Sequence, residues 1–524
     1  MNNYRGISVL PPIAKIFEKI LASQISIYLS LNKILFAGQH GFRNGHSCET
    51  ALHELISDLN KNRNSSLINL LLFIDFRKAF DLVDARKLLR KLFHYGFDNT
   101  ALNLIANYFT DRYQTVKFNK KKSPLMSIRL GVPQGSVLGP LFFLIFIDDL
   151  AFLLKFCCKM FADDTTLYDA DKDLNTLIER FVKKLESLLE WCSNNKLDLN
   201  WTKTYFMFIT NRRVKLPKEI IVFDKIVNNK KSIIKVEVVE TFKLLGVTLD
   251  NKLNFLEHCS NLKKVINRKL FSIKRLFYLA TSVKFHFFKT FILPYFDYCL
   301  SLIIYFPKST FQSLNNCFNL CPYRLFKFKP EPINLDAEDS DEQIMNDFIN
   351  KLQSYKLFTL QSRILTKLLS FTHNIINNRN APIVLKESLV GNNNQSMNVT
   401  EATSELEIRN FRSGPKTKAS IPTTKYDHLT FKFFFQKLLG TFKNFNFNIK
   451  IDAFKTQIDI EIKKDLKAFL KDFPKFNIPY SFFFKTKAKK KASKKAKDNL
   501  GKHNNLNDKC LKIINQKQVK KRKK

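Results

Sequence analysis

Two adjacent carboxylates in an apolar setting constrain this chain more than any other feature. Asp163 and Asp164 lie within residues 159–168 (Lys-Met-Phe-Ala-Asp-Asp-Thr-Thr-Leu-Tyr), where apolar and β-favouring residues on both sides predict a short hairpin with the acids at its tip. Neighbouring carboxylates repel each other, so a half-buried pair is costly unless a divalent cation lies between the oxygens. The pair therefore predicts a metal site.

A third acid is expected to join this pair. The apolar run at residues 70–74 ends in Asp75, which is typical of a central strand that delivers a carboxylate to the edge of a sheet. Three carboxylates from two strands can hold two hard cations about 3.5–4 Å apart, the geometry of phosphoryl transfer. The prediction requires that Asp75 and the pair converge in space.

Three stretches of the sequence form a series of motifs. They are residues 75–81 (Asp-Phe-Arg-Lys-Ala-Phe-Asp), residues 131–140 (Gly-Val-Pro-Gln-Gly-Ser-Val-Leu-Gly-Pro) and residues 161–164 (Phe-Ala-Asp-Asp). Their order and spacing resemble the motifs of reverse transcriptases, in the form found in non-LTR (LINE-like) retrotransposons. The resemblance implies an α+β right-hand polymerase fold, with fingers, a palm containing an antiparallel sheet, and a helical thumb. It also implies RNA-directed DNA polymerase activity, a nucleotidyltransferase reaction.

The resemblance assigns the chemistry to Asp75, Asp163 and Asp164, as catalytic residues and ligands of two Mg²⁺ ions, with Mn²⁺ as the alternative metal. Mg²⁺ suits carboxylate and phosphate oxygens. Asp163 is expected to be the direct ligand of the pair and Asp164 the more peripheral acid, because neighbours on a strand point to opposite faces. The expected partners are an RNA template, a DNA primer and dNTPs.

Five residues are candidate nucleotide contacts by the same resemblance: Arg43 for the triphosphate, Phe80 under the sugar, Gln134 and Gly135 beside the incoming nucleotide, and Lys203 near the departing pyrophosphate. A ring at residue 80 would clash with a 2′-hydroxyl and so favour deoxynucleotides. Each of these five residues also has an alternative, purely structural interpretation. Phe80 can pack in the core, Gln134 and Gly135 can belong to an ordinary turn, and Arg43 and Lys203 can be solvated surface cations.

The charge balance indicates a polyanionic partner. Lysine and arginine outnumber aspartate and glutamate by 87 to 46, a net charge of +41, which suits nucleic acid. The longest apolar run, residues 137–147, is too short to span a membrane. Residues 1–5 lack an apolar secretory core, so we expect an intracellular protein, nuclear or cytoplasmic, with mostly free thiols among its nine cysteines. Cys317 and Cys321 lack a second pair at zinc spacing.

Periodicity and composition predict the organisation of the chain. An apolar stripe after residue 11 predicts a core-facing helix (Ile13, Ile16, Phe17, Ile20, Leu21), and Ser136 is expected to cap a helix whose N-terminal N–H groups suit phosphate. The predicted domains are fingers and palm at 1–250, a helical thumb at 251–328, a linker at 329–343, a mostly helical region at 345–484 with a loop at 388–428, and a disordered basic tail at 485–524.

The sequence leaves two alternative functions open. An RNA-directed RNA polymerase shares the hand-like fold, although Phe80 argues against it. A transposon-derived remnant could bind nucleic acid without polymerising, although intact acidic motifs argue against that. The chain begins almost at the first fingers motif and shows no endonuclease ahead of it, so we expect either a truncated copy or a nicking activity from elsewhere. The oligomeric state is not predicted.

Overall fold

The computed structural model describes residues 7–128, 130–154, 156–227, 230–274, 278–326, 350, 352, 354–355, 357–390, 429–442 and 445–478. The chain divides into two compact units. Unit 1 comprises Met1–Asn261, Tyr298–Pro307 and Ile364–Asp465, and unit 2 comprises Leu262–Asp297, Lys308–Arg363 and Leu466–Lys524. The predicted linker at 329–343, the basic tail at 485–524 and residues 391–428 of the predicted loop lie outside the described residues.

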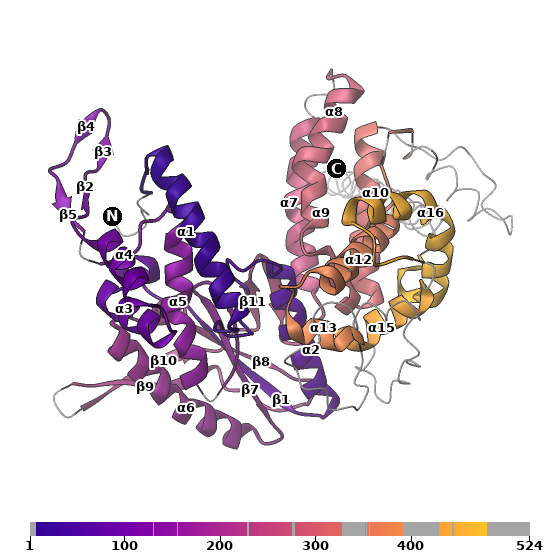
Figure 1. The fold of residues 1–524 in the computed structure, drawn as a ribbon. Coiled ribbons are helices and arrows are strands. Elements are labelled where there is room, and N and C mark those ends of the chain that lie inside the picture. Colours follow the sequence, from indigo (N-terminus) through magenta and orange to yellow (C-terminus); the bar gives the residue numbers. More distant parts are fainter. Residues whose placement is uncertain are drawn as a thin grey trace, which may run out of the picture. The chain divides into compact units, whose positions relative to one another are not determined.

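A four-stranded antiparallel sheet in the order β6-β7-β1-β8 lies at the centre of unit 1 (Figure 1). Its strands are β1 (Ile68–Ile74), β6 (Cys157–Phe161), β7 (Asp164–Asp171) and β8 (Tyr205–Ile209). All seven residues of β1 are buried, because this strand has a neighbour on each side and helices packed against it. The prediction of a central apolar strand and a mixed helical and sheet fold is confirmed.

Alternate residues of β1 are buried in different layers. The even-numbered residues belong to the main apolar core together with side chains of α5 (Leu138–Leu153) and α6 (Leu174–Asn195). On the other face, Phe73 stacks on Phe242 of β11 (Thr241–Leu244) with ring centroids 3.9 Å apart, and Asn69 donates to the Leu59 carbonyl in α2 (Cys48–Asn64). With both faces covered, polar side chains reach solvent at the strand ends.

Helix α1 (Pro12–Leu31) differs from the prediction. Four of the five residues in its expected core-facing stripe have exposed fractions between 54 and 78% (Ile13, Ile16, Phe17 and Ile20). The helix instead buries Glu18, Ile25 and Leu29, and it packs against α5. The prediction was wrong because periodicity identifies an apolar stripe but not the surface that covers it.

The N-terminus of α5 also differs from the prediction. Its first N–H groups are not available to phosphate, because the buried Glu18 carboxylate accepts from Val137 N at 2.6 Å and from Leu138 N at 3.2 Å. A carboxylate at this position compensates both the unpaired N–H groups and the positive end of the helix dipole. Ser136 contributes as predicted, since its Oγ accepts from Gly139 N.

The other elements of the first half include the predicted helix after residue 84, which Asp84 caps by accepting from Arg86 N and Lys87 N, and the predicted hairpin around Gly246, formed by β11 and β12. Their bounds are η1 (Ala79–Leu82), α3 (Ala85–His94), α4 (Asn99–Phe109), β2 (Tyr113–Gln114), β3 (Lys117–Phe118), β4 (Lys121–Lys122), β5 (Met126–Ser127), η2 (Trp201–Lys203), β9 (Glu219–Val227), β10 (Lys230–Glu237) and β12 (Val247–Asp250).

The second half of the described chain is helical, as predicted. It contains α7 (Leu256–Lys274), α8 (Thr281–Phe287), η3 (Phe288–Ile292), α9 (Leu293–Asp297), η4 (Leu300–Tyr305), α10 (Lys308–Phe326), α12 (Leu360–Asn377), α13 (Ile383–Val390), α15 (Phe431–Thr441), α16 (Ile451–Asp472) and η6 (Pro474–Phe476). Across the described ranges, none of the helices has the length and hydropathy needed to cross a bilayer. The eight cysteines in these ranges are free thiols.

Candidate active site

The acidic pair lies in a tight turn between β6 and β7. Phe161 pairs with Asp164, so Ala162 and Asp163 are the two turn residues, and Ala162 has a φ of 58°. Asp163 is half-buried and Asp164 is exposed. Because β7 begins only at Asp164, the alternation of side chains along a strand does not decide which acid is the direct ligand, and the reason given for preferring Asp163 was wrong.

The strand register brings Asp75 to the same end of the sheet. The last pair of the β1–β7 ladder joins Ile74 to Thr165, so Asp75 follows the end of β1 at the end of the sheet where β7 begins with Asp164. The two acidic motifs therefore meet at one edge, although Asp75 and Asp163 are far apart in the sequence.

Asp75 is held on its other side by Asn200. The segment before β8 runs antiparallel to the residues after β1, since Phe76 and Leu199 form a bridge. Asn200 N donates to the Asp75 carbonyl at 2.8 Å, and Asn200 Nδ2 donates to Asp75 Oδ2 at 2.8 Å. The half-buried Asp75 carboxylate thus has one oxygen fixed by an amide, and its orientation is set without a competing charge.

The donor chemistry at this edge fits a hard divalent cation. Asp75, Asp163 and Asp164 offer carboxylate oxygens at the same end of the sheet, and all three reach solvent at least in part. Within the described ranges, no group of three or more histidine, cysteine or acidic side chains is arranged so that it could by itself hold a metal ion. Mg²⁺ does not need such a cage, because it usually keeps several waters and binds through one or two carboxylates plus substrate phosphates.

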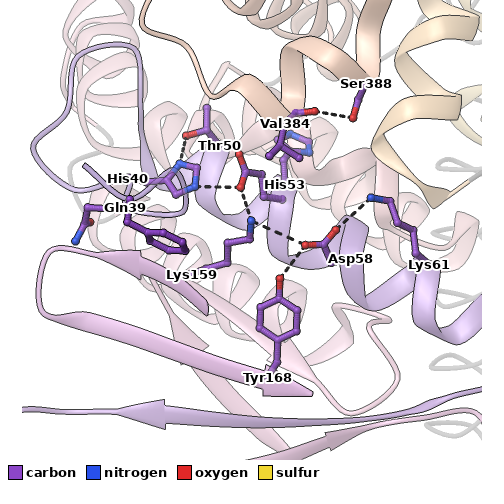
Figure 2. Close-up of polar contacts among 12 residues, drawn as sticks. Gln39, His40, Thr50, His53, Asp58, Lys61, Lys159, Tyr168, Val384 and Ser388 are labelled. Atoms are coloured by element: carbon purple, nitrogen blue, oxygen red, sulfur yellow. Dashed lines mark hydrogen bonds and ion pairs between the residues drawn. The ribbon is translucent and has the colours of Figure 1, made fainter. Parts of the chain in front are cut away.

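A buried ionic network fixes the hairpin from the side of α2 (Figure 2). Lys159 of β6 forms ion pairs with Glu54 and Asp58, His40 Nε2 lies 3.4 Å from Glu54 Oε2, and Tyr168 of β7 donates to Asp58 at 2.8 Å. Burial lowers the pKa of His40 despite its acidic neighbour. Burial alone would raise the pKa of Glu54, but His40 and Lys159 outweigh it and keep that pKa below its usual value. The network ties one helix to both strands of the hairpin.

Comparison with known proteins decides what this arrangement of motifs represents. Residues 1–249 match the family described as reverse transcriptase (RNA-dependent DNA polymerase). The chain carries a reverse transcriptase domain. One curated relative of this chain is named "Probable RNA-directed DNA polymerase from transposon BS" of Drosophila melanogaster, 29% identical over 270 residues that cover 49% of this chain and 28% of that protein.

Another relative is the "RNA-directed DNA polymerase from mobile element jockey" of Drosophila melanogaster, 24% identical over 278 residues that cover 52% of this chain and 29% of that protein. The chain spans less than a third of the length of these two relatives. Among solved structures, apo telomerase from Candida tropicalis aligns with a TM-score of 0.34 at 12% identity, covering 70% of this chain and 60% of that one.

Within the reverse transcriptase domain, the glycine-rich motif lies against the motif that follows Asp75. Val132 N donates to the Phe80 carbonyl, and Gln134 Nε2 donates to Asp81 Oδ1 at 2.7 Å. Gly135 is exposed, with a φ of 104° that favours glycine. Phe80 is half-buried and stacks on Phe143 with centroids 4.2 Å apart. Phe80, the predicted sugar contact, therefore lies near the loop of Gln134 and Gly135, the two other predicted nucleotide contacts.

The two predicted cations lie in different surroundings. Arg43 is half-buried, and its Nη1 donates to the carbonyls of Phe36 at 2.7 Å and Gln39 at 3.1 Å. Burial lowers the pKa of Arg43 from its usual value. These contacts hold its own loop together, and the triphosphate contact stays a prediction. Lys203 is exposed at the end of η2, three residues after Asn200, so it follows directly on the segment that holds Asp75.

Three residues of the site were missed by sequence reasoning: Gln39, Glu18 and Asn200. Each makes its contact with a partner more than 100 positions away in the chain. Asn200 lies three residues before Lys203, and Gln39 lies four residues before Arg43, so these two candidate residues pointed to the right regions. No local pattern indicates that an amide or a carboxylate bonds a distant backbone group.

Proposed function

We propose that this chain is an RNA-directed DNA polymerase of the non-LTR retrotransposon type, which transfers nucleotides from dNTPs to the 3′-hydroxyl of a DNA primer. The observation that carries the proposal is the convergence of Asp75 with the Asp163–Asp164 turn at one end of the central sheet, within the reverse transcriptase domain. The names of the relatives support the same activity.

The proposed metal ligands are Asp75 and Asp163, with Asp164 peripheral because its side chain is more exposed. Bound Mg²⁺ would lower the pKa of the primer hydroxyl and offset the charge of the triphosphate and leaving pyrophosphate. The chain's own residues provide position. Asn200 orients the Asp75 carboxylate, and the tight turn presents Asp163 at the strand end.

The proposed substrate contacts lie mostly in the two motifs, residues 75–81 and 131–140, that contact each other. Phe80 presents its ring beneath the deoxyribose, which supports dNTPs over NTPs, and its stacking on Phe143 resists displacement. Gln134 and Gly135 contact the incoming nucleotide, and Arg43 and Lys203 contact its phosphates. The four-stranded sheet corresponds to the palm of a right-hand polymerase.

The proposed partners are an RNA template and a DNA primer. The net charge of +41 supports a polyanionic ligand. Lys264 and Arg268 are exposed one helical turn apart on α7, in the region expected to form the thumb, while Lys263 is engaged by Ser313 Oγ at 2.8 Å. Lysine and arginine on one helix face suit a duplex backbone.

The experiment is primer extension on poly-rA/oligo-dT with dTTP and Mg²⁺, using the full chain and an Asp75→Asn variant. The variant keeps the shape of the side chain and an acceptor oxygen, so folding is preserved while the charge that holds the metal is lost. We expect template-dependent extension by the wild-type chain and none by the variant. Binding of the duplex without extension would support a nucleic-acid-binding remnant, and preference for UTP over dTTP would support an RNA polymerase.

A further inference from the structure

The segment before α2 pairs with the hairpin that carries the acidic pair. Gln39 forms a parallel bridge with Met160 of β6, His40 N donates to the Met160 carbonyl at 2.8 Å, and Met160 N donates to the Gly38 carbonyl at 2.9 Å. This pairing ends two residues before Ala162. The backbone of residues 38–40 is therefore fixed directly beside the turn that carries the acidic pair.

The Gln39 side chain continues this contact onto the turn itself. Its Oε1 accepts from Ala162 N at 3.0 Å and from Gly41 N at 2.8 Å. Its Nε2 donates to the Ala162 carbonyl at 3.4 Å. Gln39 is only 2% exposed. A single buried amide thus bonds both backbone polar groups of Ala162, and it also closes its own loop through Gly41.

Ala162 needs such support because of its backbone conformation. Its φ of 58° lies in the left-handed region, which costs a residue with a Cβ roughly 1–2 kcal/mol. The close approach of the loop is equally specific, since a Cβ on Gly41 would lie 2.2 Å from Ala162 N. The Gln39 amide thus supports the turn in this conformation, and the close approach of the loop requires a residue without a Cβ at 41.

We propose that Gln39 is a positioning residue for metal binding and nucleotide transfer, acting through Ala162 on the neighbouring Asp163. Its amide holds the turn so that the Asp163 carboxylate faces the Asp75 end of β1. Gln39 does not touch the metal or the substrate, because its polar atoms are engaged by the backbone. This inference rests on the function proposed above and adds a residue to it.

The test variant is Gln39→Met, which keeps the length of the side chain but removes all three hydrogen bonds. The matched control is Asn69→Leu, which removes an equally buried amide from the other end of the same sheet, where Asn69 bonds the carbonyls of Leu59 and Ile209. A second variant, Gly41→Ala, displaces the turn by steric contact while leaving the glutamine in place. Thermal unfolding of each full-length variant records the loss of stability.

The readouts are kcat and KM for dTTP across a Mg²⁺ titration, and Mn²⁺ affinity measured by electron paramagnetic resonance with a chain-terminated primer–template and dTTP. We expect Gln39→Met and Gly41→Ala to weaken Mn²⁺ binding and lower kcat about 10- to 100-fold, the usual effect of losing a group that orients a metal ligand. Their KM for dTTP should stay near the wild-type value. Asn69→Leu should lose stability but keep both the metal affinity and kcat of the wild-type chain.

Three results would overturn the proposal. The first is wild-type Mn²⁺ affinity and kcat in Gln39→Met. The second is a loss of Mn²⁺ affinity and kcat in Asn69→Leu as large as that in Gln39→Met, which would mean that Gln39 has only a general structural role. The third is a wild-type chain that binds Mn²⁺ no more tightly than the Asp75→Asn variant does. A wild-type chain that binds Mn²⁺ at this site but extends no primer would instead contradict the proposed function, while the Mn²⁺ comparison would still test Gln39.

Discussion

Asn200 Nδ2 donates to Asp75 Oδ2 at 2.8 Å, and Asn200 N donates to the Asp75 carbonyl at the same distance. One residue therefore fixes both the backbone and the carboxylate of the acid that ends the central strand. The backbone bond does not depend on the side chain at 200. Substitution of Asn200 should consequently affect the orientation of the carboxylate more than the fold.

The Asn200→Ala variant should lower kcat about 10- to 100-fold in primer extension, because the freed Asp75 carboxylate must be ordered by the metal itself. The KM for dTTP should change little. Thr202→Val is the control, since it removes only the hydroxyl that donates to Asn200 Oδ1 at 2.7 Å. An Asn200→Ala enzyme with wild-type kcat would contradict a role of this amide in catalysis.

The two acids of the turn should differ in their importance. Asp163 is half-buried beside the strand end and Asp164 is exposed, so we expect Asp163→Asn to lower kcat at least about a thousandfold, equivalent to roughly 4 kcal/mol in the barrier. Asp164→Asn should have a smaller effect that high Mg²⁺ concentrations partly restore. Steady-state primer extension measures both. The reverse ranking would assign the direct metal contact to Asp164.

The Phe80 ring should set the choice of sugar. Phe80→Val leaves an apolar side chain that can still contact Phe143 but opens space for a 2′-hydroxyl, and we expect the dTTP-to-UTP ratio of kcat/KM to fall about tenfold or more. The matched control is Phe143→Leu, which disturbs the same stack from the fully buried side. If both variants keep the wild-type ratio, Phe80 is a packing residue.

Acidification should destabilise the chain through His53. This fully buried ring bonds Ser301 Oγ and Tyr305 OH, and burial, assisted by the Lys367 charge, lowers the pKa of His53 to about 3. Between pH 6.5 and 3 the unfolded chain binds a proton at this residue that the folded chain does not. Stability is therefore fully present above pH 6.5 and falls as the pH decreases.

Urea unfolding at pH 7.5 and pH 5 measures this effect. Over the 1.5 pH units between about 6.5 and 5, the loss from one such histidine is about 2 kcal/mol. The His53→Gln side chain can still donate to Ser301 and accept from Tyr305. Between pH 7.5 and pH 5, the free energy of unfolding of this variant should therefore fall by about 2 kcal/mol less than that of the wild-type chain. The other titrating groups are common to both proteins and cancel in the comparison. Equal losses would show that His53 is protonated in the folded state.

The sequence predicted the acidic site because its elements are local patterns. A continuous apolar run ending in Asp75 specifies a buried central strand, and a pair of acids between two β-favouring segments specifies a tight turn. The register that brings Asp75 to the end of the sheet where β7 begins follows from pairing these two strands. The motifs of Phe80 and Gln134 lie against each other in the fold, and the nucleotide contacts of both residues stay predictions.

The remaining features depend on partners that are distant in the sequence. Glu18 resembles any charge on an amphipathic helix, yet it closes the N-terminus of α5. The exposed stripe of α1 has the same periodicity as a buried one. Gln39 acts through hydrogen bonds to a turn 123 positions away. Propensity and periodicity describe one segment at a time, so they cannot identify such contacts.

The central claim is that Asp75 and Asp163 share a metal site. It is tested most directly by a crystal structure of the full chain with a chain-terminated primer–template, dTTP and Mn²⁺, measured with anomalous scattering. The account predicts anomalous density between the carboxylates of Asp75 and Asp163, in contact with the triphosphate. Manganese bound elsewhere, or carboxylates turned away from each other around a bound triphosphate, would contradict it.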